Sequence, residues 1–103
     1  LVAIHQGNSQ KKILLIGHLD TVFPEDSPFQ KFVLSGEIAK GPGVVDDKGG
    51  DVVILYALKA LYENNLLKNA NITVVLTGDE EESGKPATIS RIPLFQAAKG
   101  ADV

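Results

Sequence analysis

The chain has 103 residues, of which 44% are hydrophobic and none is cysteine, and its formal net charge is −3. That length suits one domain at most, with a modest core. The acidic balance gives no indication of nucleic-acid binding, and no apolar run approaches the ~18 residues of a membrane-spanning helix. Because cysteine is absent, any metal must be held by carboxylates and by the two histidines, His5 and His18.

The N-terminal half predicts strands joined by loops. Residues 1–4 and the continuous apolar run at residues 12–16 predict two neighbouring strands, the second buried on both faces between helices. Prolines mark residues 21–31 as a loop. Residues 32–34 and 37–39 are expected to form a small hairpin around a Ser-Gly turn.

The C-terminal half predicts a helix, a strand and a final short helix. Residues 51–63 carry apolar side chains around most of a helix circumference, so we expect this helix to be largely buried and to end at Asn64. Residues 71–77 are β-branched and apolar and predict a second central strand. Ser90 is expected to cap a final helix that runs to Ala98.

This order of elements predicts an α/β fold, a layered sheet with helices on its faces. A strand, a crossover helix and a further buried strand are typical of that class. Ligand sites in such sheets gather beyond the carboxyl ends of the strands. The chain opens and closes within predicted strands, at residues 1–4 and 101–103, so we interpret it as a fragment with an incomplete sheet.

Three polar segments follow a predicted strand or precede the central helix, at residues 17–21, 41–50 and 77–84. In the first segment, His18 and Asp20 are two residues apart, and such residues project to the same side of an extended backbone. Asp20 is therefore placed to accept the N–H of the imidazole nitrogen that is not on a metal. That contact would fix the tautomer of His18 as a ligand.

Carboxylates of the other two segments complete a candidate metal site. Asp46 lies in a Gly-rich loop, where one carboxylate can be shared between two metal ions ~3.5–4 Å apart. Glu80 and Glu81 are adjacent after a strand, so alternation sends their side chains in different directions. One can bind a metal while the other faces an activated water as general base.

Each of these residues also has a plainer interpretation. His18 on its own would more often be a structural histidine, and Asp46 would be a good N-cap for the helix that follows it. The acidic run at residues 79–82 would be a solvated turn, an interpretation that we assign to Asp79 and Glu82. Three matched segments in one chain favour the metal site.

The three segments resemble the motifs of the zinc-dependent aminoacylase and carboxypeptidase family, which includes glutamate carboxypeptidase, acetylornithine deacetylase and succinyl-diaminopimelate desuccinylase. The matching residues are Gly17-His18-Leu19-Asp20-Thr21, Gly41-Pro42-Gly43-Val44-Val45-Asp46-Asp47-Lys48-Gly49-Gly50 and Thr77-Gly78-Asp79-Glu80-Glu81. The Gly-Pro-Gly and Asp-Asp-Lys-Gly-Gly runs are most similar to the glutamate carboxypeptidase branch.

The resemblance implies a role for each candidate residue. His18 would bind one zinc ion, Asp46 would bridge two zinc ions and Glu81 would bind the second. Glu80 would be the general base and Asp20 would orient His18, so these two are the implied catalytic residues. The implied cofactors are two Zn²⁺ ions, or Co²⁺ or Mn²⁺, and the peptide between Asp46 and Asp47 is expected to be cis.

The resemblance also implies parts that this sequence lacks. The family completes its site with a later carboxylate and a late histidine, and it carries a separate lid and dimerisation domain. Residues 1–103 would be the N-terminal part of a three-layer α/β/α zinc-exopeptidase catalytic domain, and the full protein would be a homodimer. Each zinc would have only two protein ligands here, one of them shared, where a catalytic zinc usually has three. We therefore expect the chain alone to be inactive.

The leading hypothesis is a metal-dependent hydrolase of peptide or amide bonds, a glutamate carboxypeptidase-like exopeptidase acting on small peptides or N-acyl amino acids. One alternative is an N-deacylase of acyl amino acids in the same family. Another is a non-catalytic α/β module that binds Mg²⁺ through Asp46 and Asp47. The pair His18 and Asp20 favours the enzyme, because a Mg²⁺ module needs only oxygen ligands. No nucleic-acid or membrane partner is expected.

Overall fold

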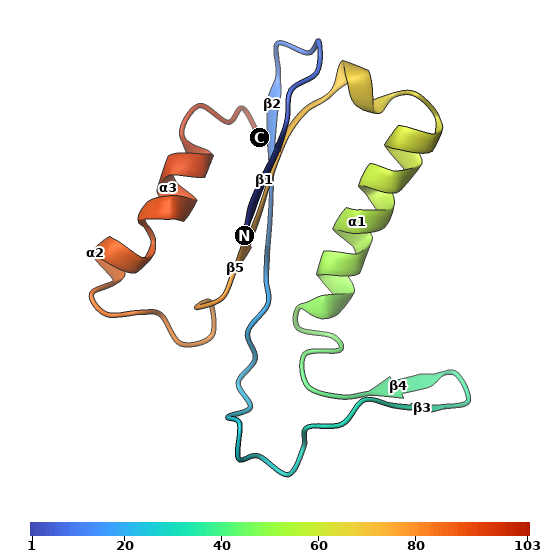
Figure 1. The fold of residues 1–103 in the computed structure, drawn as a ribbon, viewed down its shortest axis with the longest axis vertical. Helices are drawn as coiled ribbons and strands as arrows, with labels where there is room; N and C mark the ends of the chain where they lie inside the picture. Colours follow the sequence, from blue (N-terminus) through green and yellow to red (C-terminus); the bar gives the residue numbers. More distant parts are fainter.

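A computed structural model of the chain describes residues 1–103 and has a three-stranded sheet at its centre (Figure 1). The strands are β1 (Val2–His5), β2 (Lys12–His18) and β5 (Asn71–Thr77), in the order β1-β5-β2. β5 pairs in parallel with β2 and antiparallel with β1. The mixed sheet and its helices confirm the predicted α/β class.

β5 is the core of the molecule because it has a neighbour on each side and a β-branched, apolar sequence. Its residues Ile72, Val74 and Val75 are the buried hydrophobic side chains of the structure. The strand occupies the predicted residues. β2 runs two residues further than predicted, so that Gly17 and His18 belong to the strand.

The helix α1 (Lys48–Glu63) begins three residues before its predicted start and packs against β2. It was expected to be largely buried, and that prediction is wrong: Asp51 is the only buried residue of the helix. Ile54, Leu58 and Leu61 form a half-buried stripe at helical spacing. One small sheet covers only one side of a helix, so the remaining apolar side chains stay exposed.

The helix ends at Asn64 as predicted, followed by Asn65 with a φ of 56°. A short 3-10 helix, η1 (Leu67–Asn69), then leads into β5 and was not predicted. The predicted hairpin is present as β3 (Val33–Ser35) and β4 (Ile38–Lys40), which pair as a separate two-stranded sheet.

The C-terminal segment forms two short helices where one was predicted, α2 (Ala87–Ser90) and α3 (Ile92–Ala98). The expected cap at Ser90 is wrong, because the Ser90 hydroxyl donates to the Gly84 carbonyl 3.0 Å away. After α3, the backbone N–H of Asp102 donates to the Lys12 carbonyl at 2.8 Å, and Val103 accepts a 2.8 Å bond from Leu14. These two bonds lie along the free edge of β2.

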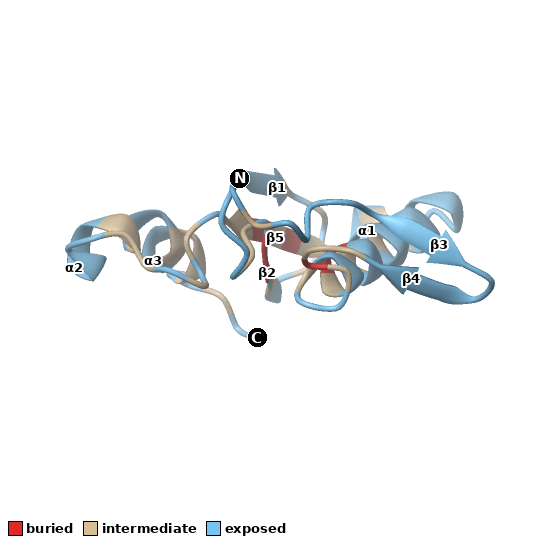
Figure 2. Cartoon of the chain, turned by 90° about the horizontal axis from the view of Figure 1, so that it is seen from below, coloured by how far each residue is buried: buried red, intermediate tan, exposed pale blue.

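The molecule is thin and open, with α1 on one side of the sheet and α2 and α3 on the other (Figure 1). Its extents are 47 × 41 × 16 Å and its radius of gyration is 16.1 Å, where ~13 Å is typical of a compact domain of this length. Only 7 of 103 residues are buried, and Figure 2 shows them around β2, β5 and the start of α1. None of the helices combines the length and the apolar character needed to cross a bilayer.

Gly7, in the turn between β1 and β2, lies against the backbone of residues 68 and 70, where no side chain fits. A Cβ there would collide with the Ala70 carbonyl oxygen and lie 2.7 Å from the Lys68 carbonyl oxygen. Because both atoms belong to the backbone, Gly7→Ala should lower the free energy of unfolding by ~1–3 kcal/mol, as overpacking does. Urea denaturation measures this. Gly78→Ala is the matched control, since a Cβ there meets nothing within 4 Å; equal effects of the two substitutions would contradict the prediction.

Candidate metal centre

The parallel pairing of β2 with β5 brings two of the polar segments to one edge of the sheet. His18 is the last residue of β2 and lies opposite Thr77, the last residue of β5. The next backbone N–H along, that of Leu19, donates to the Thr77 carbonyl at 2.8 Å. The loops that leave the two strands therefore start side by side. This edge is the carboxyl end of both strands, where ligand sites gather in such sheets.

Three side chains, one from the end of β2 and two from loops, converge at this edge. Ligand-type atoms of His18, Asp46 and Glu81 all lie within 4.8 Å of one another. His18 Nε2 and Asp46 Oδ1 lie 3.0 Å apart. Bonds of ~2.0–2.2 Å to one tetrahedral zinc place ligand atoms ~3.3–3.6 Å apart. The His18–Asp46 pair is close to this spacing, and the three side chains form a candidate site for divalent metal.

Asp20 contacts both His18 and the backbone of the third segment. Its Oδ1 lies 3.4 Å from His18 Nδ1, within ion-pair range but longer than the ~2.9 Å of a well-formed hydrogen bond. Its Oδ2 accepts the backbone N–H of Glu81 at 2.9 Å. One carboxylate thus connects the histidine at the end of β2 to the loop after β5.

Burial and the neighbouring groups act in opposite directions on the pKa of His18 and on the pKa of Asp20. Burial alone would lower the pKa of His18, but the hydrogen bond and charge of Asp46, with smaller contributions from Glu80 and the Asp20 backbone, raise it above 6.5. Burial alone would raise the pKa of Asp20, but backbone N–H groups at residues 80 and 81 and the nearby His18 lower it. His18 is 7% exposed, and its two ring nitrogens face Asp46 and Asp20.

Asp46 lies outside the helix that follows it. The N-cap residue of α1 is Asp47, and no side chain caps the helix, so the Asp46 carboxylate is free to face His18. The plainer interpretation of Asp46 as a helix cap is therefore wrong. The peptide between Asp46 and Asp47 is cis, as the family resemblance implies.

Glu80 and Glu81 occupy different positions although they are neighbours in sequence. Glu81 is half-buried and contributes to the cluster, whereas Glu80 is exposed and lies outside it. The charge of Glu80 still contributes to the raised pKa of His18. A carboxylate beside the cluster but not in it can accept a proton there.

Sequence reasoning missed the surroundings of the acidic loop. Asp79 was assigned to a solvated turn, but it is half-buried and its carboxylate accepts the Gly84 N–H at 3.3 Å and lies 3.8 Å from Arg91 Nη1. Asp51 was also missed: it is 7% exposed, and neither carboxylate oxygen has a hydrogen-bond partner. Its carboxylate occupies the space that a Cβ on Gly17 would need.

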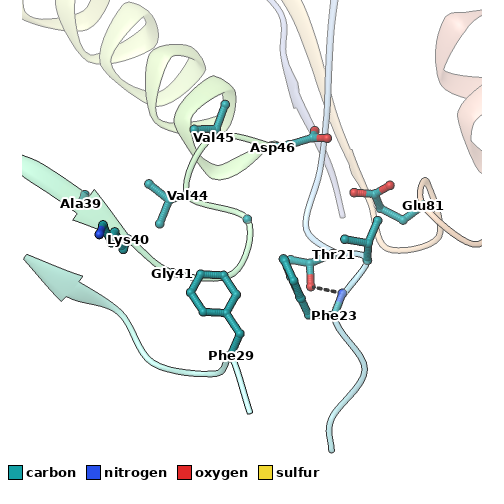
Figure 3. A pocket seen from close by; sticks show the side chains of 12 residues that line it. Thr21, Phe23, Phe29, Ala39, Lys40, Gly41, Val44, Val45, Asp46 and Glu81 are labelled. Carbon is teal, nitrogen blue, oxygen red and sulfur yellow. Dashed lines mark hydrogen bonds between the residues drawn. The ribbon is translucent and has the colours of Figure 1, made fainter. Parts of the chain in front are cut away.

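A pocket of about 370 Å³ opens beside the cluster. Asp46 and Glu81 line one end of it, and Figure 3 shows their carboxylates directed toward one another. The rest of its lining is mainly apolar and includes Phe23 and Phe29, whose rings meet edge-to-face with centroids 4.9 Å apart. A molecule held at the cluster would have an apolar surface next to it.

The sequence is similar to a known protein family and to several known proteins. A sequence model of peptidase family M20/M25/M40 matches residues 14–102. Carboxypeptidase G2 of Pseudomonas sp. (strain RS-16) is 40% identical over 101 residues, which are 94% of this chain and 23% of that protein. Succinyl-diaminopimelate desuccinylase of Rickettsia canadensis (strain McKiel) is 36% identical over 89 residues, 80% of this chain and 23% of that protein.

A third relative, an uncharacterized metallohydrolase of Methanocaldococcus jannaschii, is 32% identical over 81 residues, 73% of this chain and 20% of that protein. The chain therefore spans about a quarter or less of the length of these relatives. The family match covers the three polar segments and the strands and helix that carry them. The chain belongs to peptidase family M20/M25/M40, a family of metal-dependent hydrolases.

Proposed function

We propose that the full-length protein is a zinc-dependent exopeptidase of the glutamate carboxypeptidase type. The observation that carries this proposal is the convergence of His18, Asp46 and Glu81 within 4.8 Å, with Glu80 beside them and outside the cluster. Three donors and a neighbouring free carboxylate are the components that metal-assisted hydrolysis requires.

The proposed ligand set follows from the chemistry of the donors. His18, Asp46 and Glu81 would hold the two Zn²⁺ ions, with Asp46 shared between them, and Co²⁺ or Mn²⁺ would suit the same atoms. Segments beyond this chain supply one more carboxylate and one more histidine. The bound ions would polarise the scissile carbonyl and make the attacking water more acidic.

The residues of this chain then have separate tasks in the reaction. Glu80 takes a proton from the attacking water and returns it to the departing amine, so it serves first as base and then as acid. Asp20 holds the His18 ring and, through its other oxygen, the backbone of Glu81. The pocket beside the cluster accepts an apolar part of the substrate.

The chain is proposed to be the N-terminal part of a three-layer α/β/α catalytic domain. Helices lie on both sides of the sheet, and few residues are buried. The outer faces of these helices carry exposed apolar side chains, which further parts of a larger domain would cover (Figure 2). A lid and dimerisation domain elsewhere in the protein would make it a homodimer, and residues 1–103 alone would be inactive.

A small peptide with a C-terminal glutamate is the proposed substrate class. The higher identity to carboxypeptidase G2 than to the desuccinylase supports a peptidase. The second candidate is an N-deacylase of acyl amino acids, supported by the desuccinylase relatives. Comparing turnover of a C-terminal glutamyl dipeptide with that of N-succinyl and N-acetyl amino acids distinguishes the two.

The first prediction from the proposed function concerns the general base. In the full-length protein, Glu80→Gln should lower kcat by at least ~10³-fold, because the amide cannot accept the proton of water, while bound zinc is unchanged. Turnover assays and metal analysis of the same sample measure both. Glu82→Gln, an exposed neighbour outside the cluster, is the control and should keep its activity. Substantial turnover by Glu80→Gln would show that another group is the base.

The second prediction concerns Asp20. Asp20→Asn keeps the shape of the side chain but removes its charge and one acceptor, and should weaken zinc binding about 10–100-fold in the full-length protein. Competition with a zinc-binding dye measures the affinity. Asp26→Asn, in an exposed loop, provides a matched control. Equal affinities of the two variants would argue against a role for Asp20 in holding His18.

The third prediction separates the enzyme from a non-catalytic Mg²⁺ module. Removing metal from the full-length protein with a zinc-selective chelator should abolish hydrolysis, and added Zn²⁺ should restore it while Mg²⁺ should not, because Mg²⁺ binds imidazole poorly. Binding of Mg²⁺ with no hydrolysis under any metal would favour the module, and restoration of hydrolysis by Mg²⁺ would contradict zinc dependence.

A further inference from the structure

Arg91, the only arginine of the chain, donates hydrogen bonds to the loop that carries Glu80 and Glu81. Arg91 lies at the junction of α2 and α3. Its Nη2 donates to the Asp79 carbonyl at 2.9 Å and to the Ser83 hydroxyl at 2.8 Å, with a longer contact of 3.5 Å to the Glu80 carbonyl. Its Nη1 lies 3.8 Å from Asp79 Oδ1.

These contacts reach both peptide groups that flank Glu80. The Asp79 carbonyl belongs to the peptide before Glu80, and the Glu80 carbonyl belongs to the peptide after it. The second peptide is also held on its other side, because the Glu81 N–H donates to Asp20 Oδ2 at 2.9 Å. The peptide between the proposed base and the proposed ligand is thus held by Asp20 through its nitrogen and contacted by Arg91 at its oxygen.

The surroundings make this arrangement stronger than a surface contact. The Arg91 side chain is 19% exposed and that of Asp79 is 27% exposed, so solvent screens their charges only in part. Asp79 Oδ2 accepts the Gly84 N–H, and the Ser90 hydroxyl donates to the Gly84 carbonyl. Both ends of the acidic loop are therefore attached to the α2–α3 junction.

We propose that Arg91 is a positioning residue that sets the directions of Glu80 and Glu81 by fixing the peptide groups around them. This rests on the proposed function, in which Glu80 is the base and Glu81 a metal ligand. A planar guanidinium suits the task because Nη2 donates to the loop while Nη1 faces the Asp79 carboxylate, whereas an ammonium is a compact point charge. Arg91 touches neither the cluster nor the pocket beside it.

The test compares Arg91→Ala, Arg91→Lys and Lys85→Ala in the full-length protein loaded with zinc. Arg91→Ala should lower kcat about 10–100-fold, the range for groups that support metal ligands, with KM changed less than about threefold. Millimolar guanidinium should restore part of the lost kcat, because it refills the vacated donor site, and an ammonium salt at equal concentration should not. Arg91→Lys should remain impaired, since one ammonium cannot occupy the positions of both Nη1 and Nη2.

Lys85→Ala is the control, because it removes a positive charge from an exposed position of the same loop and should leave kcat unchanged. Zinc titration gives a readout besides activity: Arg91→Ala should weaken binding of the second zinc, and Lys85→Ala should not. Should Arg91→Ala fail to fold, Arg91→Lys and its zinc affinity carry the test. Wild-type kcat and zinc affinity in the Arg91 variants would overturn the proposal, as would a loss of kcat that guanidinium does not restore.

The proposed function and the positioning role fail in different ways. An active Glu80→Gln would overturn the general-base assignment, and the zinc affinity of the Arg91 variants would still decide whether Arg91 positions Glu81. An inactive Glu80→Gln together with a fully active Arg91→Ala would leave the proposed function standing and overturn the role of Arg91.

Discussion

The candidate site depends on the register of β2 against β5. With His18 opposite Thr77, the histidine ends its strand at the point where the acidic loop begins. A slip of one residue in β2 would turn His18 to the other face of the sheet, because strand side chains alternate. Parallel pairing along the whole of β2, from Lys12 opposite Asn71 to His18 opposite Thr77, holds this register. The pairing of these two strands therefore sets the geometry of the site.

The site is then held together by contacts between loops rather than by a hydrophobic core. Asp20 joins the end of β2 to the acidic loop, Asp46 approaches His18 from the loop before α1, and Arg91 supports the acidic loop from the far side. Hydrogen bonds to charged groups are stronger than those between neutral groups, and shielding from solvent strengthens them further. These contacts fix the three loops although few residues of this chain are buried.

Local sequence patterns predicted the parts of this structure that depend on local chemistry. The β-branched run fixed the limits of β5, and the spacing of His18 and Asp20 identified a contact within one segment. The exposure of α1 could not be predicted, because apolar periodicity does not reveal how much partner surface is present. Arg91 was missed for a related reason: its partners lie 8 to 12 residues away, beyond any helical or strand period. Ser90 was predicted to cap a helix from its residue type. Its actual bond to the Gly84 carbonyl depends on the path of the loop, which local sequence patterns do not reveal.

Anomalous diffraction at the zinc edge from crystals of the full-length protein tests whether His18, Asp46 and Glu81 hold the metal. Two zinc peaks separated by ~3.5–4 Å are expected, with the Asp46 carboxylate between them, His18 on one and Glu81 on the other. Glu80 would lie outside bonding distance of both. Zinc peaks elsewhere in the protein, with His18, Asp46 and Glu81 bound to no metal, would contradict these ligand roles.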